Sequence, residues 1–200
     1  MPTVIFFDIG GVLVSDPLDP WYASMKRTSG LERLEAYDKI RDLWARFKHG
    51  DMDEAAFWES VALNVSAPPS KAQSWRLVPY AQMAVLDGAK DVIRLIHQHN
   101  LKVGIISNMS KEWGNHIFSR LLPRAWFDPV ILSCDTGNSK PCTEIFEKAR
   151  KSAGNPEPKD CLFFDNSQKN VDAALSLGWD AVLVSSPADV RAELSKRGLS

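Results

Sequence analysis

The sequence predicts an α/β fold: a parallel sheet with helices on both faces and a helical segment inserted after the first strand. Three short apolar runs, at residues 3–8, 101–107 and 160–165, predict fully buried strands. Residues 129–133 and 180–185 are weaker strand candidates. Two further observations predict this fold. Apolar residues recur at helical spacing between these runs, and one long stretch has no strand pattern.

The helical spacing is clearest in the second half of the chain. Apolar residues recur at i, i+3, i+4 and i+7 from Ala89 to Ile96, and a shorter repeat runs from Val171 to Leu175. A further helix is expected near residues 142–153, with Pro141 in its first turn. Strands that alternate with helices predict right-handed βαβ units and a Rossmann-like sheet that is covered on both faces.

The stretch without strands runs from about residue 16 to residue 87, and two amphipathic stripes predict helices within it. One stripe extends from Ile40 to Phe47 and the other from Trp58 to Val65. Asp51 or Asp53 is expected to cap the second helix.

These patterns divide the chain into an α/β core of residues 1–15 and 88–200 and a helical cap of residues 16–87. An insertion after the first strand lies above the end of that strand. It is therefore well placed to act as a lid that excludes water and selects the substrate.

The bulk properties exclude several classes of function. The net charge is −1, so no basic stripe predicts a nucleic-acid partner. No apolar run approaches the ~20 residues of a membrane helix, and the start of the chain does not resemble a signal peptide. The 3 cysteines lack metal-binding spacing and fit a reducing compartment. We expect a cytoplasmic protein without a membrane partner, either monomeric or homodimeric.

Polar residues stand where three of the strands end and where one helix begins. Because ligands bind beyond the carboxyl ends of strands in open α/β sheets, we expect these residues to form one active site. They are Asp8, Ser107, Asn108, Lys140, Asp165 and Asn166.

Each of these residue types suits a step of group transfer. The Asp8 carboxylate can attack a phosphoryl or alkyl centre and form a covalent intermediate, although it could also only cap the strand end. Ser107 and Asn108 can donate hydrogen bonds to phosphate oxygens. Lys140 can neutralise both the nucleophile and the transferred group. Asp165 can N-cap the following helix as well as bind a ligand.

The order and types of these motifs resemble those of the haloacid dehalogenase superfamily, most of whose members are phosphatases. The resemblance covers Thr3 to about Ser185, and the inserted helices match the superfamily's C1 cap position. The segment Asp-Ile-Gly-Gly-Val-Leu from Asp8 is similar to the branch whose first motif is Asp-x-Gly, which includes sugar-phosphate phosphatases.

The resemblance implies a role for each motif residue. Asp8 and Lys140 would be catalytic, and Mg²⁺ would be the cofactor. The ligands of Mg²⁺ would be Asp8, the carbonyl of Gly10, Asp165 and Asn166. The residues that bind the phosphate or the substrate would be Gly11, Ser107, Asn108, Lys140 and Trp21.

The chain departs from the superfamily pattern at two positions that concern catalysis. Gly10 stands where most members carry a second Asp, the general acid and base, whose contribution is typically ~10²–10⁴-fold. Asn166 stands where Asp is frequent. Asn keeps an oxygen ligand but removes a negative charge, which predicts weaker Mg²⁺ binding.

The leading interpretation is a Mg²⁺-dependent phosphatase that acts on a small phosphate ester, similar to a sugar phosphate, through an aspartyl-phosphate on Asp8. Two alternatives stay open. One is a catalytically weakened member that binds a ligand or a partner, and the other is a metal-independent 2-haloacid dehalogenase. Such dehalogenases also lack the second Asp and carry Ser-Asn in the second motif, as at Ser107 and Asn108, but their fourth motif usually begins Ser-Ser-Asn.

The cap is rich in aromatic residues at helical spacing, and most of them are predicted to form its core. Trp21 and Tyr22 differ, because they follow the first motif closely. We expect Trp21 to line the substrate pocket.

Overall fold

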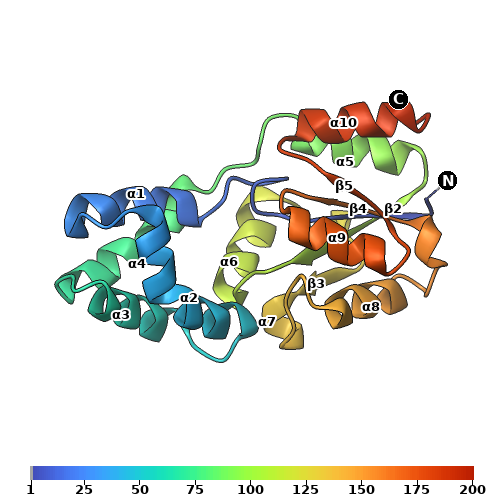
Figure 1. The fold of residues 1–200 in the computed structure, drawn as a ribbon. Coiled ribbons are helices and arrows are strands. Elements are labelled where there is room, and N and C mark those ends of the chain that lie inside the picture. Colours follow the sequence, from blue (N-terminus) through green and yellow to red (C-terminus); the bar gives the residue numbers. More distant parts are fainter. Residues whose placement is uncertain (1) are drawn as a thin grey trace.

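The computed structural model describes residues 2–200 and contains one five-stranded parallel sheet (Figure 1). The strand order β3-β2-β1-β4-β5 places β1 in the centre. The five strands are β1 (Val4–Phe7), β2 (Lys102–Ser107), β3 (Val130–Leu132), β4 (Cys161–Asp165) and β5 (Asp180–Leu183). The predicted strands, including the two weaker candidates, are confirmed.

Helices cover both faces of this sheet, which confirms the predicted α/β fold. They are α5 (Ala89–Gln98), α6 (Lys111–His116), α7 (Ser133–Thr136), α8 (Thr143–Ser152), α9 (Gln168–Ser176) and α10 (Pro187–Lys196). A π-helical turn (Ile117–Leu121) follows α6, and two 3₁₀ turns span Arg124–Trp126 and Pro158–Asp160. The helix expected from residue 142 begins at Thr143 with Cys142 at its N-cap, so Pro141 precedes the first turn.

Strand β1 shows why the sheet is buried on both sides. Val4 and Phe6 belong to the apolar cluster beneath α8 and α9, whereas Ile5 and Phe7 belong to the cluster beneath α5 and α10. Successive side chains of a strand point to opposite faces, so a strand covered on both faces must be apolar at every position. This explains the unbroken apolar run that precedes Asp8.

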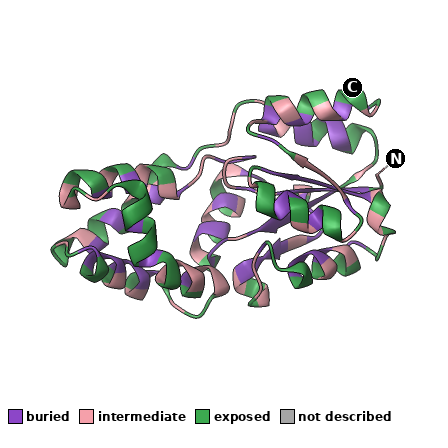
Figure 2. Cartoon of the chain, in the orientation of Figure 1, coloured by how far each residue is buried: buried purple, intermediate pink, exposed green. Residues whose placement is uncertain are grey.

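Four helices lie between β1 and α5 and form a small bundle beside the sheet (Figure 1). They are α1 (Leu18–Ser29), α2 (Arg33–His49), α3 (Glu54–Asn64) and α4 (Ser70–Gln82). Asp53 is the N-cap of α3, and its side chain accepts a hydrogen bond from the Ala56 backbone N–H at 2.8 Å. Figure 2 shows buried residues on the inward sides of these helices and exposed residues on the outward sides. We call this bundle, residues 18–82, the helical insertion.

The two chain segments that join the helical insertion to the sheet run side by side in opposite directions. Val14 and Val85 form an antiparallel bridge. The Ser15 N–H donates to the Ala84 carbonyl at 2.9 Å, and the Leu86 N–H donates to the Leu13 carbonyl at 3.0 Å. The insertion is therefore attached through a short two-stranded ribbon.

A buried carboxylate joins the helical insertion to the core away from this ribbon. Glu54 on α3 is only 2% exposed. Its Oε1 accepts hydrogen bonds from Tyr80 Oη at 2.7 Å and from Trp113 Nε1 of α6 at 3.0 Å. Its Oε2 accepts one from Arg76 Nε at 2.7 Å.

No helix among residues 2–200 is both long enough and apolar enough to cross a membrane.

We expect Glu54→Ala to lower the free energy of unfolding by about 2 to 4 kcal/mol. The substitution leaves Trp113 Nε1 and Tyr80 Oη without an acceptor, and each unsatisfied buried donor costs about 1 to 3 kcal/mol. Arg76 is half-exposed and regains water, so its loss of a partner adds little. Urea unfolding measures the change, and Glu59→Ala on the exposed side of α3 is the control. Equal stability of the two variants would contradict this role of Glu54.

Candidate active site

The carboxyl ends of three neighbouring strands bring the predicted polar residues together. Asp8 follows β1, Ser107 ends β2 and Asp165 ends β4. Lys140 reaches them from the loop before α8. Because β1 pairs with both β2 and β4 in parallel, these ends lie at one edge of the sheet.

The Asp8 carboxylate is held from one side only. Its Oδ1 accepts a hydrogen bond from Ser107 Oγ at 2.8 Å and lies 2.9 Å from Lys140 Nζ. Its Oδ2 makes no hydrogen bond with any residue from 2 to 200, and the side chain is 13% exposed. Burial raises the pKa of Asp8 above its ordinary value; the positive charge of Lys140 opposes this shift and the charge of Asp165 adds to it. Asp8 thus presents one fixed and one free oxygen.

Lys140 connects Asp8 to Asp165. Its ammonium is buried and lies 2.6 Å from Asp165 Oδ2 as well as 2.9 Å from Asp8. Burial alone would lower the pKa of Lys140, but the charges of Asp8 and Asp165 outweigh it and hold the pKa above its ordinary value. Lys140 therefore stays charged, and a charged lysine beside a nucleophilic carboxylate can also stabilise a transferred anion.

The side chain of Asn108 fixes the loop that carries Lys140. Asn108 Nδ2 donates to the Lys140 carbonyl at 2.9 Å, and Asn108 Oδ1 accepts from the Lys140 N–H at 2.8 Å. The structure thus gives Asn108 a positioning role, where the sequence analysis expected a phosphate ligand. Two complementary hydrogen bonds to one residue hold its backbone in a single orientation.

Asp165 differs from its predicted role as a metal ligand. It is fully buried, and its Oδ1 accepts hydrogen bonds from the Ser167 N–H at 2.8 Å and from Asn170 Nδ2 at 3.0 Å. Its Oδ2 pairs with Lys140 and accepts from Asn170 at 3.1 Å. Each oxygen already has two donors, which matches the capacity of a carboxylate oxygen. Asp165 therefore anchors Lys140, and α9 takes Ser167 as its N-cap instead of Asp165.

Gly11 also has a different role from the one predicted. Its N–H donates to the Val14 carbonyl at 2.7 Å, so it is not free to bind phosphate. Gly11 has a φ of +77°, and a Cβ built on it would lie 2.1 Å from Asn166 Nδ2. Only glycine combines this backbone conformation with this close approach. Gly11 thus allows the first loop and Asn166 to pack together.

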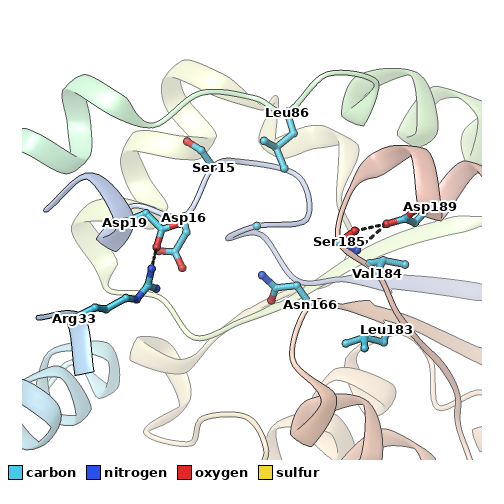
Figure 3. A pocket seen from close by; sticks show the side chains of 11 residues that line it. Ser15, Asp16, Asp19, Arg33, Leu86, Asn166, Leu183, Val184, Ser185 and Asp189 are labelled. Carbon is cyan, nitrogen blue, oxygen red and sulfur yellow. Dashed lines mark hydrogen bonds and ion pairs between the residues drawn. The ribbon is translucent and has the colours of Figure 1, made fainter. Parts of the chain in front are cut away.

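Two cavities adjoin these residues. The smaller has a volume of about 180 Å³, and Asp8, Gly10, Ser107 and Asn166 form part of its wall. The larger, shown in Figure 3, has a volume of about 720 Å³. Asp16 and Asn166 line both cavities, so these two residues lie between them. The larger cavity therefore adjoins the smaller one on the side of Asp16 and Asn166.

This arrangement of a strand-end aspartate, a hydroxyl, a buried lysine and an inserted helical bundle agrees with the family comparison. A model of haloacid dehalogenase-like hydrolases matches residues 2–178. The chain belongs to this family. The superfamily predicted from the motifs is therefore confirmed.

Two curated hydrolases are similar along most of the chain. Flavin mononucleotide hydrolase 1, a chloroplast protein of Arabidopsis thaliana, is 22% identical over 200 residues, which is 98% of this chain and 78% of that protein. The pyrimidine 5′-nucleotidase YjjG of Escherichia coli K12 is 25% identical over 190 residues, covering 88% of this chain and 84% of that protein.

Solved structures share the fold of this haloacid dehalogenase-like hydrolase. A family enzyme from Bacteroides thetaiotaomicron, in complex with magnesium and inorganic phosphate, has a TM-score of 0.73 at 19% identity, covering 92% of this chain and 94% of that one. L-2-haloacid dehalogenase from Xanthobacter autotrophicus has a TM-score of 0.68 at 18% identity, covering 92% and 78%.

Trp21 does not line either cavity, so its predicted contact with the substrate is wrong. Its side chain is fully buried inside the helical insertion, with ring centroids 5.4 Å from Trp58 and 6.0 Å from Trp75. The apolar side of α1 faces α3 and α4 instead of the sheet. Trp44 of α2, which the stripe pattern assigned to the core, lines the smaller cavity together with Trp113.

Two further contacts from the end of α2 were not predicted. His49 Nε2 lies 2.9 Å from Ser139 Oγ, next to Lys140. Ser133 Oγ donates to the Lys48 carbonyl at 2.5 Å. Sequence spacing gave no signal for either, since His49 and Ser139 are 90 positions apart. The helical insertion therefore contacts the loop that carries Lys140.

The residues of the smaller cavity can bind Mg²⁺, although few of them are charged. Asp8, Gly10 and Asn166 line the same cavity and offer a carboxylate, a carbonyl and an amide oxygen. Within residues 2–200, no three His, Cys, Asp or Glu side chains cluster in a way that could hold a metal. Mg²⁺ is commonly bound by one or two carboxylates together with waters and substrate phosphates, which fits this donor set. Asp165 does not line this cavity, and its oxygens are paired with Ser167, Asn170 and Lys140.

We expect Lys140→Met to lower the free energy of unfolding by about 3 to 5 kcal/mol at neutral pH, because two buried carboxylates lose their cation. The Asp8 pKa, already raised, then rises further, so the folded variant keeps a proton that the unfolded chain releases. Its stability accordingly falls as the pH rises from about 4 to the folded pKa of Asp8.

Urea unfolding at about pH 5 and at about pH 8 tests this sign, with Lys148→Met on the exposed side of α8 as the control. The difference in the free energy of unfolding between wild type and Lys140→Met should be smaller at the lower pH. A difference that does not change with pH would contradict the prediction.

Proposed function

We propose that this hydrolase is a Mg²⁺-dependent phosphatase of small phosphate esters that reacts through an aspartyl-phosphate on Asp8. The observation that supports it best is the state of the Asp8 carboxylate. One oxygen is fixed by Ser107 and Lys140, and the other is free beside a cavity of about 180 Å³. A preoriented carboxylate with one free oxygen is suited to nucleophilic attack.

The similar proteins support phosphate esters as substrates. The relative from Arabidopsis thaliana is named a flavin mononucleotide hydrolase, and that from Escherichia coli a pyrimidine 5′-nucleotidase. The Bacteroides thetaiotaomicron enzyme with the same fold was crystallised with magnesium and inorganic phosphate.

In the proposed reaction, Asp8 Oδ2 attacks the phosphorus atom while Ser107 and Lys140 hold Oδ1. Lys140 stays charged and balances the negative charge that gathers on the transferred phosphoryl group. Mg²⁺, held by Asp8, Gly10 and Asn166, would add positive charge at the phosphate oxygens. Water then releases phosphate from Asp8 and restores the carboxylate.

The larger cavity supports a hydroxyl-rich leaving group such as a sugar. Its wall includes the hydroxyl groups of Ser15 and Ser185 and the carboxylates of Asp19 and Asp189 (Figure 3). Such groups exchange hydrogen bonds with alcohols. A volume of about 720 Å³ lies within the range of pockets that bind small molecules.

We expect purified protein to release nitrophenol from p-nitrophenyl phosphate only when Mg²⁺ is present. Asp8→Asn should lower kcat by roughly 10⁴-fold or more, because the amide cannot form the acyl-phosphate. The control is Asp172→Asn on the exposed side of α9, which should keep full activity.

Other outcomes would overturn the proposal. Chloride release from 2-chloropropionate without any phosphate release would indicate the dehalogenase alternative. Phosphate binding without turnover of any ester would indicate a binding protein. Equal rates for wild type and Asp8→Asn would remove Asp8 as the nucleophile.

We expect Asn166→Asp to lower the Mg²⁺ concentration needed for half-maximal activity, because it adds a second carboxylate to the donor set. Calorimetry of Mg²⁺ binding should show the same direction of change. Asn115→Asp on α6 adds an equal charge away from the site and serves as the control. An unchanged Mg²⁺ requirement would exclude Asn166 as a ligand.

A further inference from the structure

Cleavage of an ester of a weakly acidic alcohol needs a proton donor for the leaving oxygen. Without one, the departing oxygen must carry a full negative charge. Position 10 holds glycine in this chain, so it offers no acidic side chain. The donor must therefore come from another residue beside Asp8 or from outside the protein.

The wall of the smaller cavity holds only two titratable side chains among the described residues, Asp8 and Asp16. Asp8 is occupied as the nucleophile. Lys140 does not line this cavity, and its ammonium is paired with two carboxylates. Asp16 is thus the one available acid on this wall within residues 2–200.

A side chain at residue 10 would point toward Pro17, the residue that follows Asp16. A Cβ built on Gly10 would lie 3.8 Å from Pro17 Cδ, the ring carbon attached to the nitrogen that Asp16 precedes. Asp16 also lines the larger cavity. It therefore stands between the cavity beside Asp8 and the larger cavity.

One oxygen of Asp16 is fixed and the other is free. Oδ1 accepts a hydrogen bond from the Leu18 N–H at 2.8 Å, which holds the carboxyl at the start of α1. Oδ2 makes no hydrogen bond within the described chain. This geometry allows Oδ2 to carry a proton toward the cavities while the side chain stays in place.

Burial of Asp16 favours its protonated form. Burial raises the pKa of Asp16 above its ordinary value; the Leu18 N–H lowers it, Asp19 raises it and Arg33 lowers it. Arg33 is already paired with Asp19, which limits its effect on Asp16. Asp189 lies at the far side of the larger cavity, where its carboxylate accepts hydrogen bonds from Ser185 (Figure 3).

We propose that Asp16 is the general acid and base of the reaction, an inference that rests on the proposed phosphatase function. Asp8 Oδ2 forms a bond to phosphorus, the bond to the ester oxygen breaks, and that oxygen takes its proton from Asp16 Oδ2 and leaves as the alcohol. Water then attacks the phosphorus and gives a proton to the Asp16 carboxylate. The bond to Asp8 breaks, its electron pair returns to the Asp8 carboxylate, and hydrogen phosphate leaves.

The test compares wild type and Asp16→Asn on two aryl phosphates of similar size. Asparagine keeps the acceptor for the Leu18 N–H but cannot donate an acidic proton. Nitrophenolate leaves without a proton, whereas phenolate is a poorer leaving group. We expect kcat/KM to fall by about 10²-fold or more for phenyl phosphate and by about tenfold or less for p-nitrophenyl phosphate. The value of kcat/KM reports cleavage of the ester and not the later hydrolysis of the phosphoenzyme.

A second measurement tests the role of Asp16 as the general base. If water loses its base, the phosphoenzyme accumulates, so Asp16→Asn should give a burst of nitrophenol in the first turnover. The matched control is Asp53→Asn, because Asp53 caps α3 through the Ala56 N–H and lies on an exposed surface. It should change neither the leaving-group dependence nor the burst.

The outcomes separate the two proposals. If wild type turns over no phosphate ester, the phosphatase function fails and the role of Asp16 fails with it. If wild type is active and Asp8→Asn is not, but Asp16→Asn slows both esters equally or neither, the role of Asp16 alone is overturned. Equal unfolding transitions of Asp16→Asn and wild type confirm that the comparison concerns folded protein.

Discussion

A single buried ammonium, that of Lys140, bridges the carboxylates of Asp8 and Asp165 at the carboxyl edge of the sheet. These carboxylates follow two adjacent strands and would repel each other in a buried site without a cation between them. The loop that carries Lys140 must therefore reach the sheet edge, and Asn108 holds it there through two hydrogen bonds. Only Oδ1 of Asp8 takes part in this bridge, which leaves Oδ2 free.

The sequence was most informative where one physical cause dominates. Every strand residue of β1 is buried on one face or the other, so the apolar run before Asp8 left little choice of structure. The same holds for the ends of the strands, where polar residues such as Ser107 must meet at one edge. The fold and the group around Asp8 could be predicted for this reason.

The sequence was less informative where two arrangements satisfy the same pattern. Trp21 and Trp44 both lie on helices whose apolar side faces other helices, and spacing does not tell which ring reaches the sheet edge. Asp165 and Asn166 are adjacent at a strand end, and only the positions of Lys140 and Asn170 decide which of them is fully engaged. The long-range contact of His49 with Ser139 depends on how the insertion lies against the core.

The two hydrogen-bonded segments around Val14 and Val85 have a mechanical consequence. Sliding the helical insertion across the sheet would shear this pair of segments and break the bonds between Ser15 and Ala84 and between Leu86 and Leu13. Turning the insertion about the line of the ribbon leaves those bonds intact. The contact between Glu54 and Trp113 lies outside the ribbon and would have to break in such a turn. The ribbon thus resists sliding of the insertion, whereas the contacts of Glu54 with Trp113 and of His49 with Ser139 resist its turning.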